Sequence, residues 1–310
     1  MYLFNPENDL ALANFSANYM PPASAVRMSR EMALLPIWYA GSENRFTGNA
    51  GDGIGHPKGI VEKSQTVVGG SLGVVVNSRE NEEEVMVIAE GEENLVFLDR
   101  MKELFDLKVS LVPMSSLASY PNALLVPWGW NPLLVSALRV SGVSERQLPS
   151  MAELKQLRGY AHRKHAVETL PDLMALDERL IGESSYVTSV EELLAYLESV
   201  PGDKVLKMPL SGSGKGLIWI LGGITDKQID RCRRVIRVQG GVVAEPIWDR
   251  VRDFAMEFWL DNGTARFAGY SLFRTTASGA YMGNELLTDA RTEEVLGSYV
   301  PISLLHQLRE

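Results

Sequence analysis

The sequence predicts a mixed protein, with an α/β fold in its first half and an α+β arrangement in its second half. Short apolar runs alternate with amphipathic stretches between residues 73 and 140, which is the β-α-β rhythm of a parallel sheet. From residue 187 onward come a capped helix, two strands around a glycine-rich loop, a basic helix and three further strands. This order predicts two domains, at residues 1–150 and 151–310.

In the first half, strands are expected at residues 2–4, 73–77, 85–89, 108–113 and 123–127. Helices are expected before Pro36, which we read as a stop signal, and over residues 92–105 and 133–140. The Asn-rich stretch at residues 5–15 is interpreted as a capped turn rather than a substrate-contacting loop. Residues 41–73 contain few apolar side chains, and we expect them to form a long surface loop.

In the second half, Ser189 is the expected N-cap of a helix over residues 190–198. Strands are expected at residues 205–207 and 217–220, a helix at 226–238, and strands at 242–247, 253–260 and 266–274. We read the pair Asn284 and Glu285 as part of a loop. The last segment, from residue 298 to 310, is expected to be a terminal helix.

Composition excludes several classes of protein. The 310 residues carry a net charge of −9, which argues against a general nucleic-acid or anionic-membrane surface, so we expect no nucleic acid or membrane partner. The single cysteine, Cys232, cannot form an internal disulfide, and no apolar run approaches a membrane span. The N-terminus lacks a basic, then apolar, signal segment, and the expected location is the cytoplasm. A homo-oligomer is left open.

The glycine-rich loop from Ser211 to Gly216 joins the two short strands at residues 205–220. Its few side chains leave backbone N–H groups free to approach an anion, and Lys207 and Lys215 add positive charge. It is not a P-loop, because Pro209 and Gly216 stand where that motif requires Gly and Ser or Thr. A flexible hairpin without a ligand is the competing interpretation of the loop taken alone.

The order of these segments resembles the nucleotide-binding part of the ATP-grasp superfamily. The residues that carry the resemblance are HRKHAVETL, VTSVEEL, VLKMP, the Gly/Ser/Lys loop, VVAEP, DFAME and the strand ending near Arg274. The resemblance implies an ATP-grasp fold, in which two α+β subdomains clasp a nucleotide, preceded by a small parallel-sheet, pre-ATP-grasp-like domain. It divides the second half into a lid subdomain at 151–240 and part of the central subdomain at 241–310.

The resemblance also implies roles for single residues. Lys207 matches the lysine on the α- and β-phosphates, and Arg163, with Lys164 as the alternative, matches an upstream basic residue that reaches the same phosphates. Arg274 resembles the catalytic arginine facing the transferring phosphate. The remaining matches are to the loop that folds over ATP and to the hinge at the adenine: Ser211, Ser213, Gly214 and Lys215 in the loop, and Glu245 and Ile247 in the hinge. Asp253, or alternatively Asp249, matches the ribose-binding acid.

The implied activity is that of an ATP-dependent ligase. ATP with Mg²⁺ would activate a small-molecule or peptide carboxylate as an acyl phosphate, and an amine or thiol would then displace the phosphate. No acidic-x-Asn pair follows between residues 286 and 310, so the strand that carries the family's metal ligands is not found and the metal residues stay unknown. A truncated chain, ligands from a partner, or a nucleotide-binding module without catalysis are the alternatives, with a relative that binds no ATP as the third class.

Overall fold

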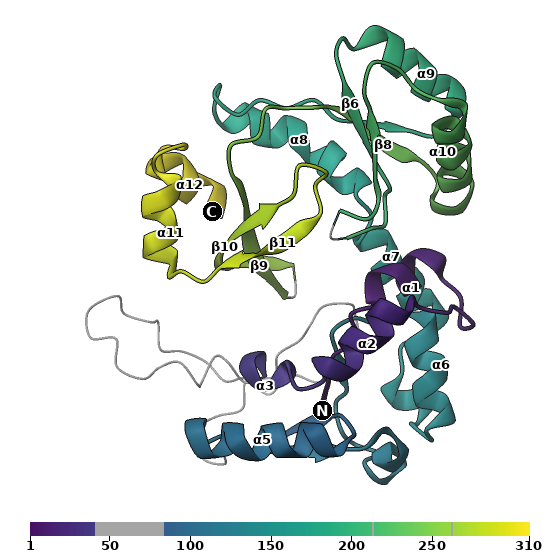
Figure 1. Cartoon of the computed structure of the whole chain (residues 1–310), viewed down its shortest axis with the longest axis vertical. Coiled ribbons are helices and arrows are strands. Elements are labelled where there is room, and N and C mark those ends of the chain that lie inside the picture. Colours follow the sequence, from purple (N-terminus) through teal and green to yellow (C-terminus); the bar gives the residue numbers. More distant parts are fainter. Residues whose placement is uncertain (41–83, 213, 262) are drawn as a thin grey trace. The chain divides into compact units, whose positions relative to one another are not determined.

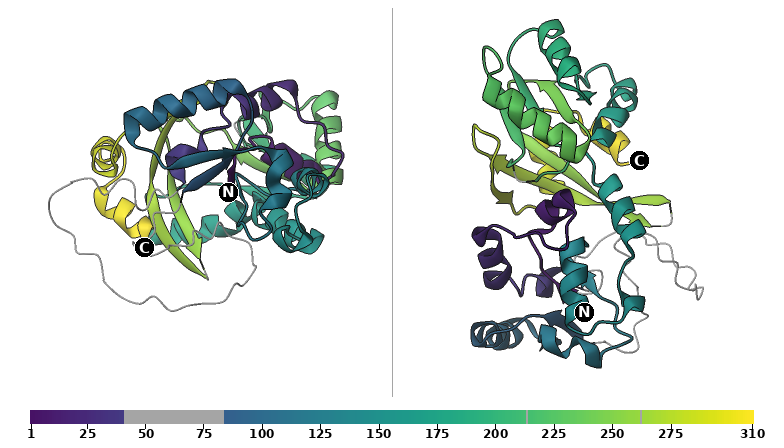
Figure 2. Two further views of the ribbon diagram at one scale, coloured as in Figure 1. Left: turned by 90° about the horizontal axis from the view of Figure 1, so that it is seen from below. Right: turned by 90° about the vertical axis from the view of Figure 1, so that its right-hand side faces the viewer.

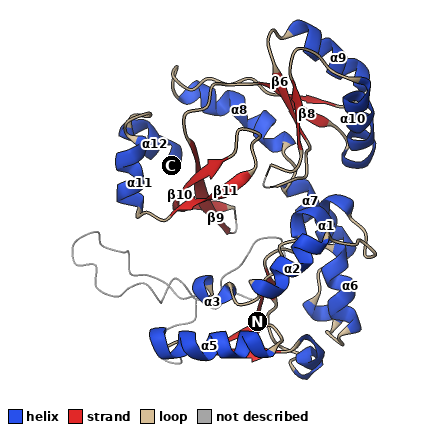
Figure 3. Ribbon diagram, viewed as in Figure 1, coloured by secondary structure: helices blue, strands red, loops and turns tan. Residues whose placement is uncertain are grey.

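The computed structural model describes residues 1–40, 84–212, 214–261 and 263–310. The expected loop at 41–73, the strand at 73–77 and the loop residue Ser213 lie outside this part. By its internal contacts the chain divides into two compact units after Leu157, and each is described by itself. Both the parallel α/β sheet and the antiparallel sheets expected from the sequence are present. Strands of the two antiparallel sheets are labelled in Figures 1 and 3.

The first unit is built on a four-stranded parallel sheet with the order β3-β2-β1-β4. Its strands are β1 (Tyr2–Leu3), β2 (Val85–Ile88), β3 (Val109–Val112) and β4 (Val126–Pro127). Its helices are α1 (Asn8–Asn14), α2 (Ala23–Glu31), α3 (Pro36–Tyr39), α5 (Glu92–Phe105), η1 (Met114–Ser119), α6 (Pro132–Val140) and η2 (Glu145–Gln147). One apolar cluster packs α3 and α5 against the sheet, and a second packs η1 and α6, so helices cover both of its faces.

Two local expectations in this unit are wrong. Pro36 does not end a helix but begins α3, because proline fits the first helical turn, whose N–H groups have no partner within the helix. The stretch after β1 continues into α1 instead of remaining a turn. The side chain of Asn5 then ties this corner to β4, since it donates to the carbonyl of Gly129 at 2.8 Å and accepts from its N–H at 3.1 Å.

The second unit begins with helical segments and a four-stranded antiparallel sheet, in the order β5-β8-β6-β7. Its strands are β5 (Ser185–Val187), β6 (Lys204–Lys207), β7 (Leu217–Ile220) and β8 (Val242–Pro246). Its helices are α7 (Met151–Tyr160), which spans the division, α8 (Lys164–Leu176), α9 (Val190–Ser199) and α10 (Asp226–Gln239). The hydroxyl of Ser189 accepts from the N–H of Glu192 at 3.0 Å, which confirms the predicted cap of α9.

Helices α9 and α10 lie on the same side of this sheet (Figure 2). Their buried residues pack against Leu206, Ile218 and Ala244 of the strands. Because side chains alternate along a strand, Lys207, Trp219 and Glu245 must point to the opposite face. The sheet therefore has one face that supplies the core and one that carries polar groups.

A three-stranded antiparallel sheet completes the unit, in the order β11-β10-β9. It contains β9 (Asp253–Asp261), β10 (Thr264–Thr275) and β11 (Tyr281–Glu285), and is followed by α11 (Asp289–Leu296) and α12 (Ile302–Arg309). Leu272 packs against Leu296 and Leu305 of these helices, so they cover one face. Asn284 and Glu285 belong to β11 rather than to a loop, because they pair with Phe273 and Leu272.

Two adjacent leucines of α9 test the core that this helix forms with the four-stranded sheet β5-β8-β6-β7. Leu193 is fully buried against the strands, whereas Leu194 is 37% exposed. We expect Leu193→Ala to lower the free energy of unfolding of this unit by about 2–5 kcal/mol, because it leaves a cavity. Leu194→Ala, with the same change in helix propensity, should cost less than about 1 kcal/mol. Urea unfolding followed by hydrogen exchange of the β6 and β8 amides would measure both, and equal losses would contradict this packing.

Candidate functional site

Lys207 and Glu245 form an ion pair on the four-stranded sheet, on the face opposite α9 and α10. Lys207 ends β6, and the register places it diagonally from Glu245 on β8, within reach across the strands. The hydroxyl of Ser184 donates to the other carboxylate oxygen of Glu245 at 3.3 Å. The two side chains are 29% and 20% exposed, so the pair is partly shielded but still open to a solute. A polyphosphate could thus replace Glu245 as the partner of the Lys207 ammonium group while both strands stay folded.

Arg163 holds the beginning of the glycine-rich loop. Its backbone N–H donates to the carbonyl of Pro209 at 3.0 Å, and its guanidinium donates to the carbonyls of Met208 and Ser211 and to the hydroxyl of Ser211. Burial lowers the pKa of Arg163, and the negative charge of Glu245 opposes this shift. An arginine remains charged even so. The structure therefore brings Arg163 and Ser211 together, with the charge of Glu245 close enough to act on Arg163.

Two residues, one just before α8 and one at the end of α10, fix this corner further. The Nδ1 atom of His162 accepts from the N–H of Lys164 at 3.2 Å, which leaves Nε2 as the donor to the carbonyl of Gln239 at 3.1 Å. Burial lowers the pKa of His162, which agrees with this neutral tautomer. The side-chain oxygen of Gln239 accepts from the N–H of Leu210 at 2.9 Å. Hydrogen bonds from Arg163 and to Gln239 thus both hold the segment that leads into the loop.

Lys164, the alternative to Arg163, occupies a different environment. It begins α8 and lies 4.0 Å from Glu168, one turn along the same helix, with 41% of its side chain exposed. Arg163 is consequently the member of the pair that contacts the loop, and Lys164 is an exposed helix residue.

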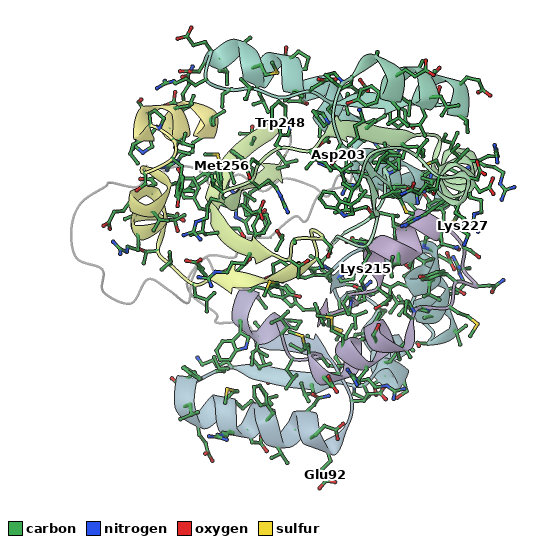
Figure 4. All side chains as sticks on the ribbon, turned by 45° about the horizontal axis from the view of Figure 1, so that its top comes forward. Glu92, Asp203, Lys215, Lys227, Trp248 and Met256 are labelled. Carbon is green, nitrogen blue, oxygen red and sulfur yellow. The ribbon has the colours of Figure 1, made fainter. Side chains whose placement is uncertain are left out.

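The glycine-rich loop meets the turn between β10 and β11. Gly214 has a φ of +76°, and a Cβ atom there would stand 2.2 Å from the carbonyl oxygen of Gly279. The indole N–H of Trp219 donates to the carbonyl of Ser278 at 3.1 Å. Only glycine fits at position 214, both for its conformation and for this close approach. Lys215, labelled in Figure 4, is exposed on the loop.

A cavity of about 520 Å³ lies beside Glu245, near the end of β8, and Trp248, just after it. Its walls come from α8, from residues 182–184 and from the hinge itself. The lining residues are His165, Ala166, Thr169, Leu170, Leu173, Gly182, Glu183, Ser184, Glu245 and Trp248. The N–H of Ile247 donates to the carbonyl of Asp203 at 3.0 Å, so this backbone group is already used (Figure 4 labels Asp203 and Trp248). The cavity combines apolar side chains with the carboxylates of Glu183 and Glu245 and the hydroxyls of Thr169 and Ser184.

Asp253 and Arg274 lie on opposite faces of the β9-β10-β11 sheet. Asp253 accepts from the hydroxyl of Thr275 at 2.7 Å and lies 3.6 Å from Arg250. Arg274 shares the parity of the core residue Leu272 along β10, and it donates to Glu285 at 2.9 Å. Asp249, the alternative to Asp253, is exposed. The structure therefore does not bring the predicted ribose acid and the predicted catalytic arginine to one surface.

No group of three or more His, Cys, Asp or Glu side chains that could hold a metal ion occurs in the described part of the chain. Within the same described residues, no helix is both long and apolar enough to cross a membrane.

Sequence reasoning missed Ser184, Gln239 and Trp248. Ser184 reaches Glu245 from 61 residues away, and the side chain of Gln239 reaches Leu210 from 29 residues away. Neither residue lies in a motif, so only the fold reveals them. The aromatic side chain of Trp248, directly after Ile247, is the one signal in the sequence that points to this cavity.

We expect Arg163→Gln to loosen the start of the loop, because four donated hydrogen bonds depend on this residue and three of them come from its guanidinium. Amide hydrogen exchange at residues 208–212 should accelerate by about tenfold or more, since each lost hydrogen bond to a charged donor costs about 1.5–3 kcal/mol. Lys164→Gln, which removes the neighbouring charge, is the matched control. If both variants exchange at the wild-type rate, Arg163 does not hold the loop.

No family model and no curated protein sequence matches the chain. Solved structures match part of it. An N5-carboxyaminoimidazole synthetase from Staphylococcus aureus, complexed with ADP, is 13% identical over 65% of this chain, with a TM-score of 0.36. This chain spans only 58% of that protein.

Two further matches cover more of the other protein. A RimK domain ATP-grasp protein from Sphaerobacter thermophilus is 14% identical over 68% of this chain and 80% of its own, with a TM-score of 0.33. A D-alanyl-alanine synthetase A from Vibrio cholerae is 13% identical over 72% and 79%, with a TM-score of 0.34. At TM-scores this low, the site assignments rest on the residues themselves.

Proposed function

We propose that the second unit binds ATP and that the protein is an ATP-dependent ligase that joins a carboxylate to an amine or a thiol. The observation that carries this proposal is the placement of Lys207. It stands at the end of β6, where the glycine-rich loop begins, and is paired with Glu245, which also lines a cavity. A cation, a glycine-rich loop with backbone N–H groups and a partly apolar cavity are the three parts that a nucleoside triphosphate requires.

In this proposal the polyphosphate displaces Glu245 from Lys207. A lysine–phosphate contact is at least as strong as the lysine–carboxylate contact that it replaces, because both are charge-assisted hydrogen bonds and the phosphate carries more charge. The freed carboxylate of Glu245 then lies at the wall of the cavity, where it can accept from an amino group of the base. Trp248, 48% exposed, offers a ring against which the base can stack.

Arg163 and the loop would complete the phosphate site. Arg163 contributes a second positive charge behind Lys207 while it holds Ser211 in place. The backbone N–H groups around Gly214 and the ammonium of Lys215 would approach the distal phosphates. Asp253, or alternatively Asp249, would accept from the ribose hydroxyls, and the role of Arg274 at the transferring phosphate stays a prediction.

The reaction would proceed in two displacements. An oxygen of the substrate carboxylate attacks the γ-phosphorus, the bond to the bridging oxygen breaks, and ADP leaves with that electron pair. The amine nitrogen or thiol sulfur then attacks the acyl carbon, loses its proton, and expels inorganic phosphate. The acyl phosphate hydrolyses in water, so a loop that covers it protects the intermediate. Magnesium would accompany the ATP polyphosphate, with no ligand assigned in this chain. We place this chemistry in the cytoplasm, where ATP is abundant.

Lys207→Ala tests nucleotide binding. ATP with Mg²⁺ at 100 times its dissociation constant should stabilise the wild-type protein by about 2.7 kcal/mol, which raises the melting temperature by several degrees. The variant should lose most of this shift. Lys227→Ala, which removes an exposed lysine from α10, is the matched control and should keep it. Absence of any shift for the wild type at millimolar ATP would overturn the proposal.

Turnover separates a ligase from a binding module without catalysis. The wild-type protein should release ADP and phosphate when a panel of amino acids and short peptides is added with ATP. ATP-dependent stabilisation without product release for any member of a broad panel would favour the binding module.

A further inference from the structure

Helices α9 and α10, which we call the helix pair, carry opposite charges on the surface that they turn away from their sheet. α9 contains three glutamates and no basic residue, whereas α10 contains five basic residues and two aspartates. The two helices contact each other and pack on the same face of the four-stranded sheet (Figure 2). The second unit thus presents an acidic helix beside a basic one.

Five charged side chains point outward from the helix pair. The helical repeat places them on the side opposite the residues that are buried against the sheet. They are Glu191 and Glu198 of α9 and Lys227, Arg234 and Arg237 of α10, with Lys227 labelled in Figure 4. All five are exposed, and none forms an ion pair or a side-chain hydrogen bond with another residue in the described part of the chain. These charges therefore make no polar contact within the fold.

Several of these charges also oppose their own helix. Lys227 lies in the first turn of α10 and Glu198 in the last turn of α9, each at the helix end where the dipole disfavours its charge. Arg234 and Arg237 stand three residues apart on one helix face, where like charges repel each other. Local stability does not explain this arrangement, whereas an oppositely charged partner surface would.

The two helices run in opposite directions. β5 and β6 are both antiparallel to β8, so they run the same way, and α9, which joins them, runs back against them. β7 and β8 are both antiparallel to β6, so α10, which joins them, runs opposite to α9. The Glu198 end of α9 therefore lies toward the Lys227 end of α10, and the Glu191 end lies toward Arg237.

This surface is complementary to itself under one two-fold rotation. An axis parallel to the helices stacks α9 of one molecule on α10 of another, antiparallel, so that Glu198 faces Lys227 and Glu191 faces Arg237 twice. An axis across the helices stacks α9 on α9 and α10 on α10, which brings like charges together at a cost in free energy. A two-fold interface uses the same patch of both subunits. Charge thus selects the first arrangement.

We propose that the helix pair binds the helix pair of a second copy of this chain, with α9 of each molecule on α10 of the other around a two-fold axis. The occupant is a second copy because the surface carries both signs: α9 would repel a polyanion, and α10 would repel a polycation. Leu194 and Val238, 37% and 53% exposed on the same two helices, supply apolar area. The proposal does not depend on nucleotide binding.

The size of the helix pair predicts a weak dimer. Helices of 10 and 14 residues are about 15 and 21 Å long and together about 20 Å wide, an outline of roughly 400 Å². A stable complex buries about 800 Å² of each partner, so this dimer belongs to the transient class. Because exposed ion pairs are screened by salt, the dimer should weaken as ionic strength rises.

Sedimentation velocity of the full chain, without nucleotide and over a range of protein concentrations, tests the association. The wild-type protein should approach the mass of a dimer at high concentration in low salt. Its dissociation constant should rise by about tenfold or more between about 0.05 M and about 0.5 M salt, since the charges that face each other are screened.

Two charge-reversal variants test the position of the interface. The first combines Arg234→Glu with Arg237→Glu and makes both helices acidic, and the second combines Glu191→Lys with Glu198→Lys and makes both basic. Each variant alone should remain a monomer. An equimolar mixture should form a heterodimer with at least the wild-type affinity, because every acidic helix then faces a basic one. All four positions are exposed, and a melting curve confirms that each variant is folded.

The matched control combines Arg100→Glu with Arg146→Glu, two exposed arginines of α5 and η2. It changes the net charge as much as the first variant does and should dimerise like the wild-type protein. A wild-type protein that stays monomeric in low salt would overturn the proposal and leave the helix pair as a solvated surface. Dimerisation of either reversal variant alone, or a mixture that stays monomeric, would also overturn it, because the contact would then lie elsewhere.

Discussion

The ion pair between Lys207 and Glu245 is the interaction on which the account of the second unit depends. It forms because two adjacent antiparallel strands place a lysine and a glutamate diagonally on the face that α9 and α10 leave uncovered. Ser184 on one side and the charge of Arg163 on the other complete its surroundings. The pair of Lys207, at the mouth of an anion-friendly loop, is poorly placed for stability alone, because the desolvation cost of a partly buried ion pair offsets much of its attraction. It is well placed to exchange one anion for another.

The second constraint is the contact between the glycine-rich loop and the β10–β11 turn. Gly214 approaches the backbone of Gly279 so closely that a side chain at position 214 would clash with it, and Trp219 adds a hydrogen bond to the same turn. Arg163 and Gln239 thus hold the segment that leads into the loop, and Gly214 meets the β10–β11 turn further along. The turn itself is closed by hydrogen bonds between Thr276 and Ala280 at 2.8 and 3.0 Å. The four-stranded sheet and the three-stranded sheet are connected through this contact.

Much of the fold could be predicted from the sequence because its signals are local. The cap at Ser189, the amphipathic repeat of α10 and the strand composition around the glycine loop each act within about ten residues. The apolar stripe of α5 was also visible, although Leu95 and Leu104 of that stripe are 52% and 60% exposed. Periodicity identifies a helix but does not reveal how much of its apolar face is covered.

What the sequence could not reveal depends on pairing between distant residues. Glu285 was read as a loop residue because its strand exists only by pairing with β10. Arg252 reaches Glu285 across 33 residues, and Ser184 reaches Glu245 across 61, with no motif to mark either contact. Asp253 pairs with Phe273, and side chains alternate along β10, so the next residue, Arg274, points to the opposite face. The order of the motifs along the chain does not reveal this. Residue identities thus predicted the charges of the site, and topology decided which of them meet.

The most direct measurement is a crystal structure of the protein with a non-hydrolysable ATP analogue and Mg²⁺. We predict that Nζ of Lys207 leaves Glu245 and lies about 2.7–2.9 Å from a phosphate oxygen, the range of a charge-assisted hydrogen bond. The base should occupy the cavity beside Trp248. A structure in which the nucleotide binds elsewhere, while Lys207 and Glu245 remain paired, would contradict the central claim.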